Sequence, residues 1–193
     1  MSVLTVANQL TLLRVVLIPA FVILVIYGHL GWALIVFASA CLTDALDGLI
    51  ARWSDQKSTL GAWLDPMADK LLLVSMFVML TLPDIGSVNR LPLWFTVLVI
   101  SRDVAIVATV AVVNLAIGHR TFRPSIYGKI ATALFIVTGI SALYFNYLEQ
   151  QSPLVRLLIY ASTVITFVSA ADYAVRVIKM QHQPAPRKDG RAL

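Results

Sequence analysis

The feature that most constrains this chain is a series of six long apolar segments separated by short polar or Gly- and Pro-containing stretches. The segments are Leu10–Tyr27, Leu30–Ala51, Gly61–Leu82, Leu91–Ile117, Ile126–Leu148 and Leu154–Ile178. Each is close to or above the ~20 residues that a helix needs to cross a bilayer. Of the 193 residues, 59% are hydrophobic and only 13% are charged, whereas soluble domains average about 25% charged residues. We therefore predict an all-α polytopic membrane protein with six transmembrane helices.

The basic residues predict the orientation of these helices. Two of the chain's 15 Lys and Arg, Arg90 and Arg156, fall on one side of the membrane, and Arg102 lies within a segment. The other twelve fall on the side that holds both termini: Arg14, Arg52, Lys57, Lys70, Arg120, Arg123, Lys129, Arg176, Lys179, Arg187, Lys188 and Arg191. Because basic loops stay in the cytoplasm, we expect both termini to be cytoplasmic.

The same pattern predicts the domain organisation and the partners. Residues 1–180 are expected to form one six-helix transmembrane domain in the cytoplasmic (inner) membrane. Residues 181–193 are rich in Pro, Lys and Arg, and we expect them to form a short, disordered cytoplasmic tail. The positive charge is expected to meet anionic lipid headgroups of the bilayer, and no nucleic-acid partner is expected. Small residues of the later segments offer a face for a homodimer, although no GxxxG motif specifies one.

Two consecutive segments carry carboxylates at the same predicted end. Asp44 and Asp47 are three residues apart, and Asp65 and Asp69 are four apart, so each pair shares one face of a helix. An ionisable residue inside a span costs roughly 2.5–3.5 kcal/mol on insertion scales. Because the two segments are antiparallel and joined by a short loop, all four carboxylates are expected to converge at the cytoplasmic surface of the membrane.

Four converging carboxylates repel one another unless cations lie between them. Oxygen-only ligands favour hard divalent ions such as Mg²⁺ or Mn²⁺. Two such ions about 3.5–4 Å apart form the arrangement that drives phosphoryl displacement. Spacing alone leaves two other interpretations open: a proton or ion relay in a transporter, and structural pairing of the acids with Arg52, Lys57 and Lys70.

Small residues accompany the carboxylates. Gly48 and Ala51 follow the first pair, and Gly61 precedes the second. Their lack of bulk allows a ligand or a partner helix to approach the backbone closely. Arg52 ends the second segment, where its guanidinium can grip a diphosphate.

Together these residues resemble the signature of the CDP-alcohol phosphotransferases, also called CDP-alcohol phosphatidyltransferases. The pattern is Asp44-x2-Asp47-Gly48-x2-Ala51-Arg52-x8-Gly61-x3-Asp65-x3-Asp69, and it matches at eight positions with every gap in place. The resemblance implies a six-helix membrane fold and transfer of a phosphoalcohol group from a CDP-alcohol to a hydroxyl, with release of CMP. It implies Asp44, Asp47 and Asp65 as metal ligands, and Asp69 as a metal ligand or neighbour and the general base. It also implies Gly48, Ala51, Arg52 and Gly61 as the lining of the CDP pocket.

Three further motifs resemble the cardiolipin and phosphatidylglycerophosphate synthases of this family. They are Asn8-Gln9-Leu10-Thr11-x2-Arg14, Ser101-Arg102-Asp103 and Arg123-Pro124-Ser125-x2-Gly128-Lys129, of which the last two look more like the cardiolipin branch. The resemblance implies CDP-diacylglycerol as donor and phosphatidylglycerol as acceptor, with glycerol-3-phosphate as the alternative acceptor.

Either acceptor carries a phosphate and needs a cation near the carboxylates. The candidates are Arg102, Arg120, Arg123 and Lys129. Arg102 is costly within a span unless it is paired, and Asp103 or Asp172 is expected to partner it. An ion pair of purely structural value is the competing interpretation for Arg102.

Overall fold

The computed structural model of the protein describes residues 6–53, 61–83, 87–117 and 125–181, and within them the side chains of residues 12–43, 70–83, 87–109 and 125–175. Six α-helices and no strand occupy this described part of the chain. They are α1 (Val6–Ile26), α2 (Leu30–Trp53), α3 (Gly61–Thr81), α4 (Leu93–Ile117), α5 (Ile126–Tyr147) and α6 (Pro153–Gln181). Each helix begins and ends within a few residues of a predicted apolar segment, so the all-α class and the six helices are confirmed.

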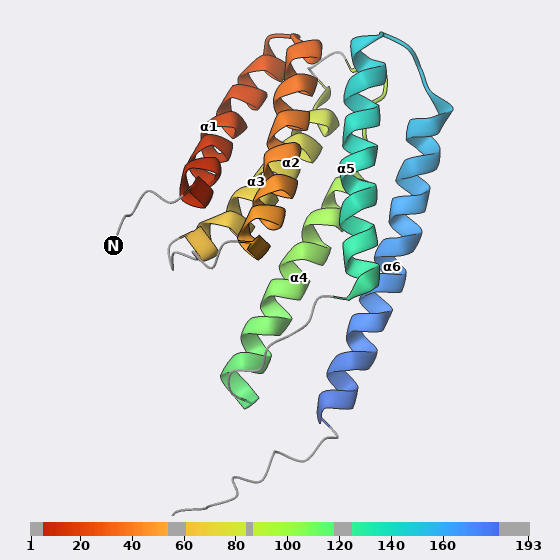
Figure 1. Ribbon diagram of the computed structural model, residues 1–193. Coiled ribbons are helices and arrows are strands. Elements are labelled where there is room, and N and C mark those ends of the chain that lie inside the picture. Colours follow the sequence, from red (N-terminus) through yellow and green to blue (C-terminus); the bar gives the residue numbers. More distant parts are fainter. Residues whose placement is uncertain (1–5, 54–60, 84–86, 118–124, 182–193) are drawn as a thin grey trace, which may run out of the picture.

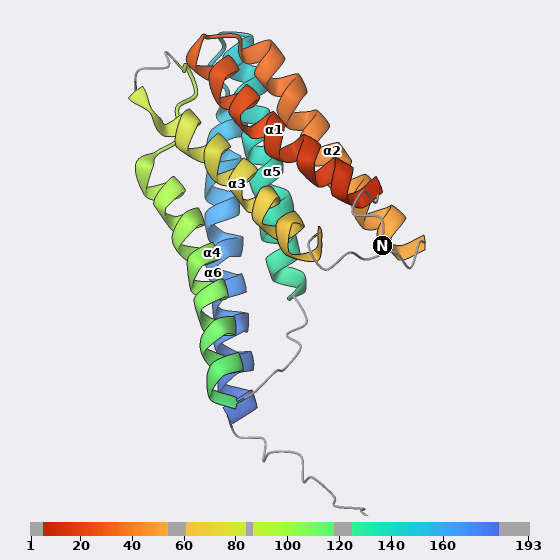
Figure 2. The same ribbon diagram turned by 90° about the vertical axis from the view of Figure 1, so that its left-hand side faces the viewer.

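The helices form two hairpins joined by two further helices (Figure 1). α1 packs on α2, α5 packs on α6, and α2 contacts α5. α3 packs against α1 and α5, and α4 packs against α3 and α6. We call the end at which α2 finishes and α3 begins the signature end. The far end is the opposite one, where α1 turns into α2, α3 into α4 and α5 into α6 (Figure 2).

An aromatic cluster holds three of the helices together. Phe77 of α3, Phe95 of α4 and Phe135 of α5 are all buried. Their ring centroids lie 5.5, 5.9 and 6.3 Å apart, with the rings near perpendicular to one another. Edge-to-face pairs of this kind contribute about 0.5–1.5 kcal/mol beyond the area they bury. The cluster therefore fixes α3, which carries two of the four signature aspartates, against α4 and α5.

The exterior of the bundle is apolar over much of its length. Val16, Trp32, Leu93 and Phe167 each expose about two thirds of their surface. An exterior of this kind marks a surface that is covered by lipid or by another apolar partner. Two helical stretches of the described chain, Ile126–Tyr147 and Pro153–Val175, are long and apolar enough to cross a membrane. Shorter apolar stretches occupy Leu12–Ile26, Leu30–Thr43 and Lys70–Thr81.

Asn89 ties the two connections of the far end together. Its backbone N–H donates to Oδ1 of the buried Asn146 at 2.6 Å, and its side-chain Nδ2 donates to the carbonyl of Gln150 at 2.6 Å. Its Oδ1 accepts the backbone N–H of Ser152 at 2.9 Å. The α3–α4 connection is thus bonded to the end of α5 and the start of α6. Satisfied networks of this kind rigidify the segments that they join.

Candidate active site

The signature residues lie in the last turns of α2 and the first turns of α3. Asp44 and Asp47 fall within α2, and Asp65 and Asp69 fall within α3, so the helical spacing predicted for each pair is confirmed. Both stretches lie at the signature end of the bundle (Figure 1). Their side chains fall outside the described residues, so their roles as ligands and base remain predictions. The same holds for the predicted CDP-pocket residues Gly48, Ala51, Arg52 and Gly61.

The signature is the candidate metal site of this chain. Among the described side chains, no three of His, Cys, Asp or Glu gather to hold a metal ion. The signature supplies four carboxylates, two from the end of α2 and two from the start of α3, and both lie at the signature end (Figure 1). A donor set made of oxygens alone fits Mg²⁺ or Mn²⁺.

Arg14 is a fully buried cation on the helix beside the signature. It lies in the third turn of α1 and is 1% exposed, so it is more than a charge that anchors the topology. Ile26, at the end of α1, lies twelve positions after Arg14, and Leu42 lies twelve positions after Leu30, at the start of α2. Because α1 and α2 form a packed hairpin, Arg14 lies at the depth of the α2 turn that reaches Asp44. A buried guanidinium persists only with polar or charged partners.

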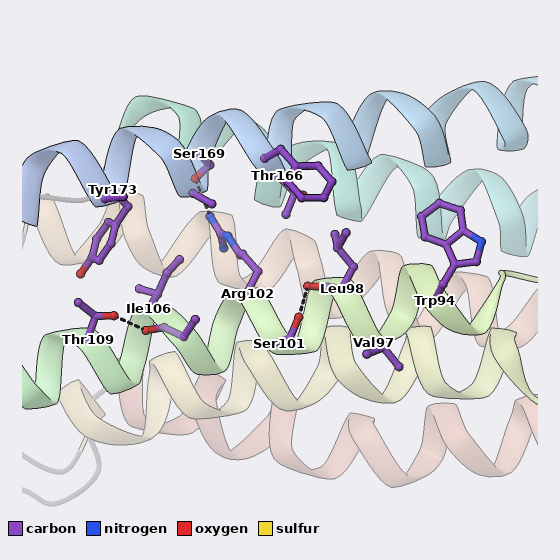
Figure 3. A pocket seen from close by; sticks show the side chains of 14 residues that line it. Trp94, Val97, Leu98, Ser101, Arg102, Ile106, Thr109, Thr166, Ser169 and Tyr173 are labelled. Atoms are coloured by element: carbon purple, nitrogen blue, oxygen red, sulfur yellow. Dashed lines mark hydrogen bonds between the residues drawn. The ribbon is translucent and has the colours of Figure 1, made fainter.

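Arg102 lies at the centre of a polar cluster between α4, α5 and α6. Its Nη1 donates to Oδ1 of Asp103 at 2.8 Å, and the two side chains are 11% and 20% exposed. Its Nη2 reaches the carbonyl of Gly128 at 3.3 Å. The same Nη2 reaches the Oγ of Ser169 at 3.4 Å (Figure 3). The predicted pairing with Asp103 is confirmed. The Nε atom is buried without a hydrogen-bond partner.

Gly128 and Ser125 connect the motif at the start of α5 to the Ser101-Arg102-Asp103 motif of α4 and to α6. A Cβ on Gly128 would lie 3.2 Å from Nη2 of Arg102, so only glycine lets the guanidinium reach this carbonyl without displacement. Ser125 occupies the N-cap position of α5 but makes no side-chain cap. Its hydroxyl instead donates to Oδ2 of Asp172 at 2.5 Å. The start of α5 is therefore tied to both α4 and α6.

A groove of about 760 Å³ runs between α4 and α6, with Arg102 on its wall. Its lining is predominantly apolar and includes Leu98, Ile106 and Phe167. Trp94 lies at one end of the groove, and Tyr173 lies toward the other (Figure 3). A cation on the wall of an apolar groove suits a ligand that has both a phosphate and hydrocarbon chains.

The remaining predicted acceptor residues are placed only in part. Lys129 is exposed in the first turn of α5, where its side chain is accessible to a ligand. Arg120 and Arg123 lie outside the described residues. α6 also buries three hydroxyl side chains that were not predicted as site residues: Ser162, Thr166 and Ser169. Their spacing of four and three residues is a helical polar stripe, and that signal was available in the sequence.

The comparisons with known proteins agree with this arrangement. The protein is an all-helical bundle with an apolar exterior and an aspartate signature at one end. These features indicate a helical membrane protein with a candidate phosphoryl-transfer site. The model of the CDP-alcohol phosphatidyltransferase family matches residues 4–169. The chain therefore belongs to the CDP-alcohol phosphatidyltransferase family and is a phosphotransferase of phospholipid biosynthesis.

Curated relatives of the chain carry two different names. A Mycobacterium tuberculosis protein named "Probable phosphatidylglycerophosphate synthase" is 32% identical over 183 residues, which cover 90% of this chain and 81% of the relative. The human cardiolipin synthase (CMP-forming) is 35% identical over 165 residues, covering 76% of this chain and 53% of the relative. The rat cardiolipin synthase (CMP-forming) is 34% identical over the same length. The relatives thus support the family and both branches that the motifs resemble.

Proposed function

We propose that this enzyme transfers the phosphatidyl group of CDP-diacylglycerol to a hydroxyl of phosphatidylglycerol, forming cardiolipin and CMP. The observation that carries the choice of acceptor is the position of Arg102 on the wall of the α4–α6 groove. An acceptor with two acyl chains needs apolar surface beside its phosphate contact. Glycerol-3-phosphate needs only a polar pocket that is open to water.

The donor half of the site is assigned to the signature. Asp44, Asp47 and Asp65 would hold two divalent ions, with Asp69 as a ligand or a neighbour of the ions. Members of the family are generally dependent on divalent metals, which supports this assignment. When bound, such ions neutralise the diphosphate and the charge that develops on the leaving CMP. Gly48, Ala51, Arg52 and Gly61 are assigned to the CDP moiety.

Asp69 is assigned as the general base. It accepts the proton of the acceptor hydroxyl, and the resulting oxygen attacks the phosphorus that carries diacylglycerol. The bond between this phosphorus and the bridging oxygen of the diphosphate breaks, and CMP leaves with that electron pair. One P–O bond forms as one breaks, so no other reactant is required.

The acceptor phosphate is assigned to cations around the start of α5. Arg102 already contacts Gly128 there, and Lys129 is the next residue of the same turn. Arg120 and Arg123 complete the proposed set. Figure 2 shows the start of α5 at the same end of the bundle as the start of α3, which carries Asp65 and Asp69. This placement is compatible with an acceptor held at one end by cations and presented to Asp69.

The apolar exterior supports a wider proposal about topology. We propose that all six helices cross the inner membrane, with both termini and the active site at the cytoplasmic face. The two stretches that satisfy the length and composition of a span belong to α5 and α6. In this proposal residues 1–180 are one catalytic domain, residues 181–193 are a basic tail, and two copies associate as a homodimer.

The alternative function is synthesis of phosphatidylglycerophosphate from glycerol-3-phosphate. The coverage of 90% of this chain by the mycobacterial relative favours it. Purified protein in mixed micelles, supplied with labelled CDP-diacylglycerol and each acceptor separately, decides between the two. We expect labelled cardiolipin with phosphatidylglycerol. Formation of phosphatidylglycerophosphate from glycerol-3-phosphate, with phosphatidylglycerol inert, would replace the proposed acceptor and leave the family membership unchanged.

A further inference from the structure

The far end of the bundle holds a polar hollow whose cations the transfer reaction does not use. The hollow measures about 520 Å³ and lies between the α3–α4 connection and the start of α6. Arg90 and Arg156 both line it and are both exposed. No described residue of its lining is a carboxylate. These are the two arginines on the side of the membrane where the topology signal disfavours basic residues, so their presence in one hollow suggests a ligand.

The two guanidinium groups are available to a ligand. Arg90 uses its Nε to donate to the carbonyl of Thr81 at 2.6 Å, which fixes the side chain and leaves its two terminal nitrogens for another acceptor. Arg156 makes no hydrogen bond or ion pair with the part of the chain that the structure describes. Guanidinium groups bind phosphate oxygens in a bidentate geometry. The Asn89 network holds the connection that carries Arg90 against the start of α6, so the two cations are kept in one place.

The hollow continues into apolar surface. Trp94 lines both this hollow and the α4–α6 groove, so the two meet at that side chain. Tyr160 also lines the hollow, and Trp and Tyr at the end of a membrane helix lie at the level of lipid headgroups. From Trp94 to Arg102, α4 rises by about 12 Å. The hydrocarbon region of one leaflet, half of the bilayer core, is roughly 15 Å thick, so this stretch of groove has the depth that an acyl chain occupies.

We infer that the far-end hollow binds the phosphate of an anionic phospholipid in the leaflet opposite the signature, with an acyl chain lying against Trp94 and the adjoining groove. Three features of the hollow match three parts of such a lipid. The two arginines match its phosphate, Trp94 and Tyr160 match its headgroup region, and the adjoining apolar groove matches an acyl chain. Its phosphate contacts, Arg90 and Arg156, are distinct from those of the acceptor, which are assigned to Arg102 and the start of α5. Its acyl chain lies in the Trp94 end of the same α4–α6 groove. It rests on α4 and α6 crossing the membrane and does not depend on which acceptor is used.

The test measures lipid binding by the purified, delipidated full-length protein. Phosphatidic acid serves as the anionic probe because it has no alcohol headgroup to accept a phosphatidyl group, and phosphatidylcholine with the same acyl chains is the comparison. Native mass spectrometry counts the lipids bound to each variant. A basic residue near an anionic membrane contributes about 1 kcal/mol, or roughly fivefold in affinity. We expect Arg90→Gln with Arg156→Gln to weaken binding of phosphatidic acid about 25-fold and to leave phosphatidylcholine binding unchanged.

Matched variants make the result specific. Arg176→Gln with Lys179→Gln removes two charges from the opposite end of α6 and should change the affinity less than threefold. Arg156→Gln alone changes a side chain that is exposed and bonded to no described residue, so the fold should remain intact while affinity falls about fivefold. Trp94→Ala should weaken the binding of both lipids.

Three outcomes would overturn the inference. The first is equal loss of phosphatidic acid binding in the Arg90/Arg156 and Arg176/Lys179 pairs, which would indicate attraction to net charge alone. The second is full affinity in the Arg90→Gln, Arg156→Gln variant. The third is displacement of phosphatidic acid by equimolar inorganic phosphate, which would make the hollow a site for free phosphate. CMP release with CDP-diacylglycerol and acceptor should be unchanged in the same variant, whichever acceptor is used.

Discussion

Replacing Arg102 separates its structural role from its proposed role in acceptor binding. Arg102→Met keeps the apolar stem of the side chain and removes the guanidinium. The strongest interaction that this substitution removes is the charge-assisted hydrogen bond from Nη1 to Asp103 at 2.8 Å. The interactions of Nη2 with Gly128 and Ser169, at 3.3 and 3.4 Å, are near the limit for a hydrogen bond and contribute little.

The expected loss of stability in Arg102→Met follows from the unpaired Asp103 carboxylate that the variant leaves behind. Loss of a hydrogen bond to a charged group costs about 1.5–3 kcal/mol. Because the Asp103 side chain is 20% exposed, water reaches it in part, and we expect a loss of stability of ~2 kcal/mol rather than the 3–5 kcal/mol of a fully buried pair. The acceptor KM should rise roughly 10–150-fold if the guanidinium also binds the acceptor phosphate.

The double variant Arg102→Met with Asp103→Asn distinguishes the two roles. It removes the unpaired carboxylate, so thermal unfolding in detergent should return close to that of the unmodified protein. The acceptor KM should stay high, because the cation is still missing, while the KM for CDP-diacylglycerol should be unaffected. Recovery of both stability and acceptor KM in the double variant would show that Arg102 is a structural ion-pair residue, and the proposed acceptor contact would be wrong.

Three further pairs of substitutions test the signature aspartates, the buried Arg14 and the packing of α3 against α5. Asp69→Asn should abolish CMP release while CDP-diacylglycerol binding is retained, whereas Asp44→Asn should weaken both, and equal loss of binding in the two variants would argue against a separate general base. Arg14→Met should lower the free energy of unfolding by about 3–5 kcal/mol, because it removes a fully buried guanidinium and leaves its polar surroundings unsatisfied. The exposed Leu157→Met should change that free energy by less than about 0.5 kcal/mol, and similar values for the two variants would contradict the buried role of Arg14. Gly139→Ala should lower the free energy of unfolding by about 1–3 kcal/mol, because its Cβ would collide with the end of the Met76 side chain. Adding Met76→Ala to this variant should recover part of that loss in thermal unfolding, and additive losses for the two substitutions would refute the collision.

The sequence predicted the helices closely because the bilayer imposes a simple rule. A span must be a long apolar helix, so its interruptions stand out in the sequence. α1 and α3 end just before Gly28 and Pro83, whereas α4 and α6 begin at or just after Pro92 and Pro153. The spacing of the signature aspartates predicted their shared helix faces for the same reason, since both pairs lie inside helices that the apolar pattern had already located.

Contacts between distant helices were less accessible to sequence reasoning. The pairing of Arg102 with Asp103 was expected because the two are adjacent and an unpaired cation within a span is costly. The contact of Arg102 with Gly128, and that of Ser125 with Asp172, depend on how α4, α5 and α6 pack. Periodicity assigns residues to faces but does not state which faces meet. The junction of the far-end hollow with the groove at Trp94 arises from the same packing.

The most direct test of the central claim is CMP release from CDP-diacylglycerol by the metal-stripped protein with acceptor present. If the signature carboxylates hold two divalent ions, stripped protein should release no CMP and should regain activity with added Mg²⁺ or Mn²⁺. Asp44→Asn should require a higher metal concentration for half-maximal release than the unmodified protein. Undiminished CMP release by the stripped protein in the presence of chelator would contradict the metal-dependent mechanism.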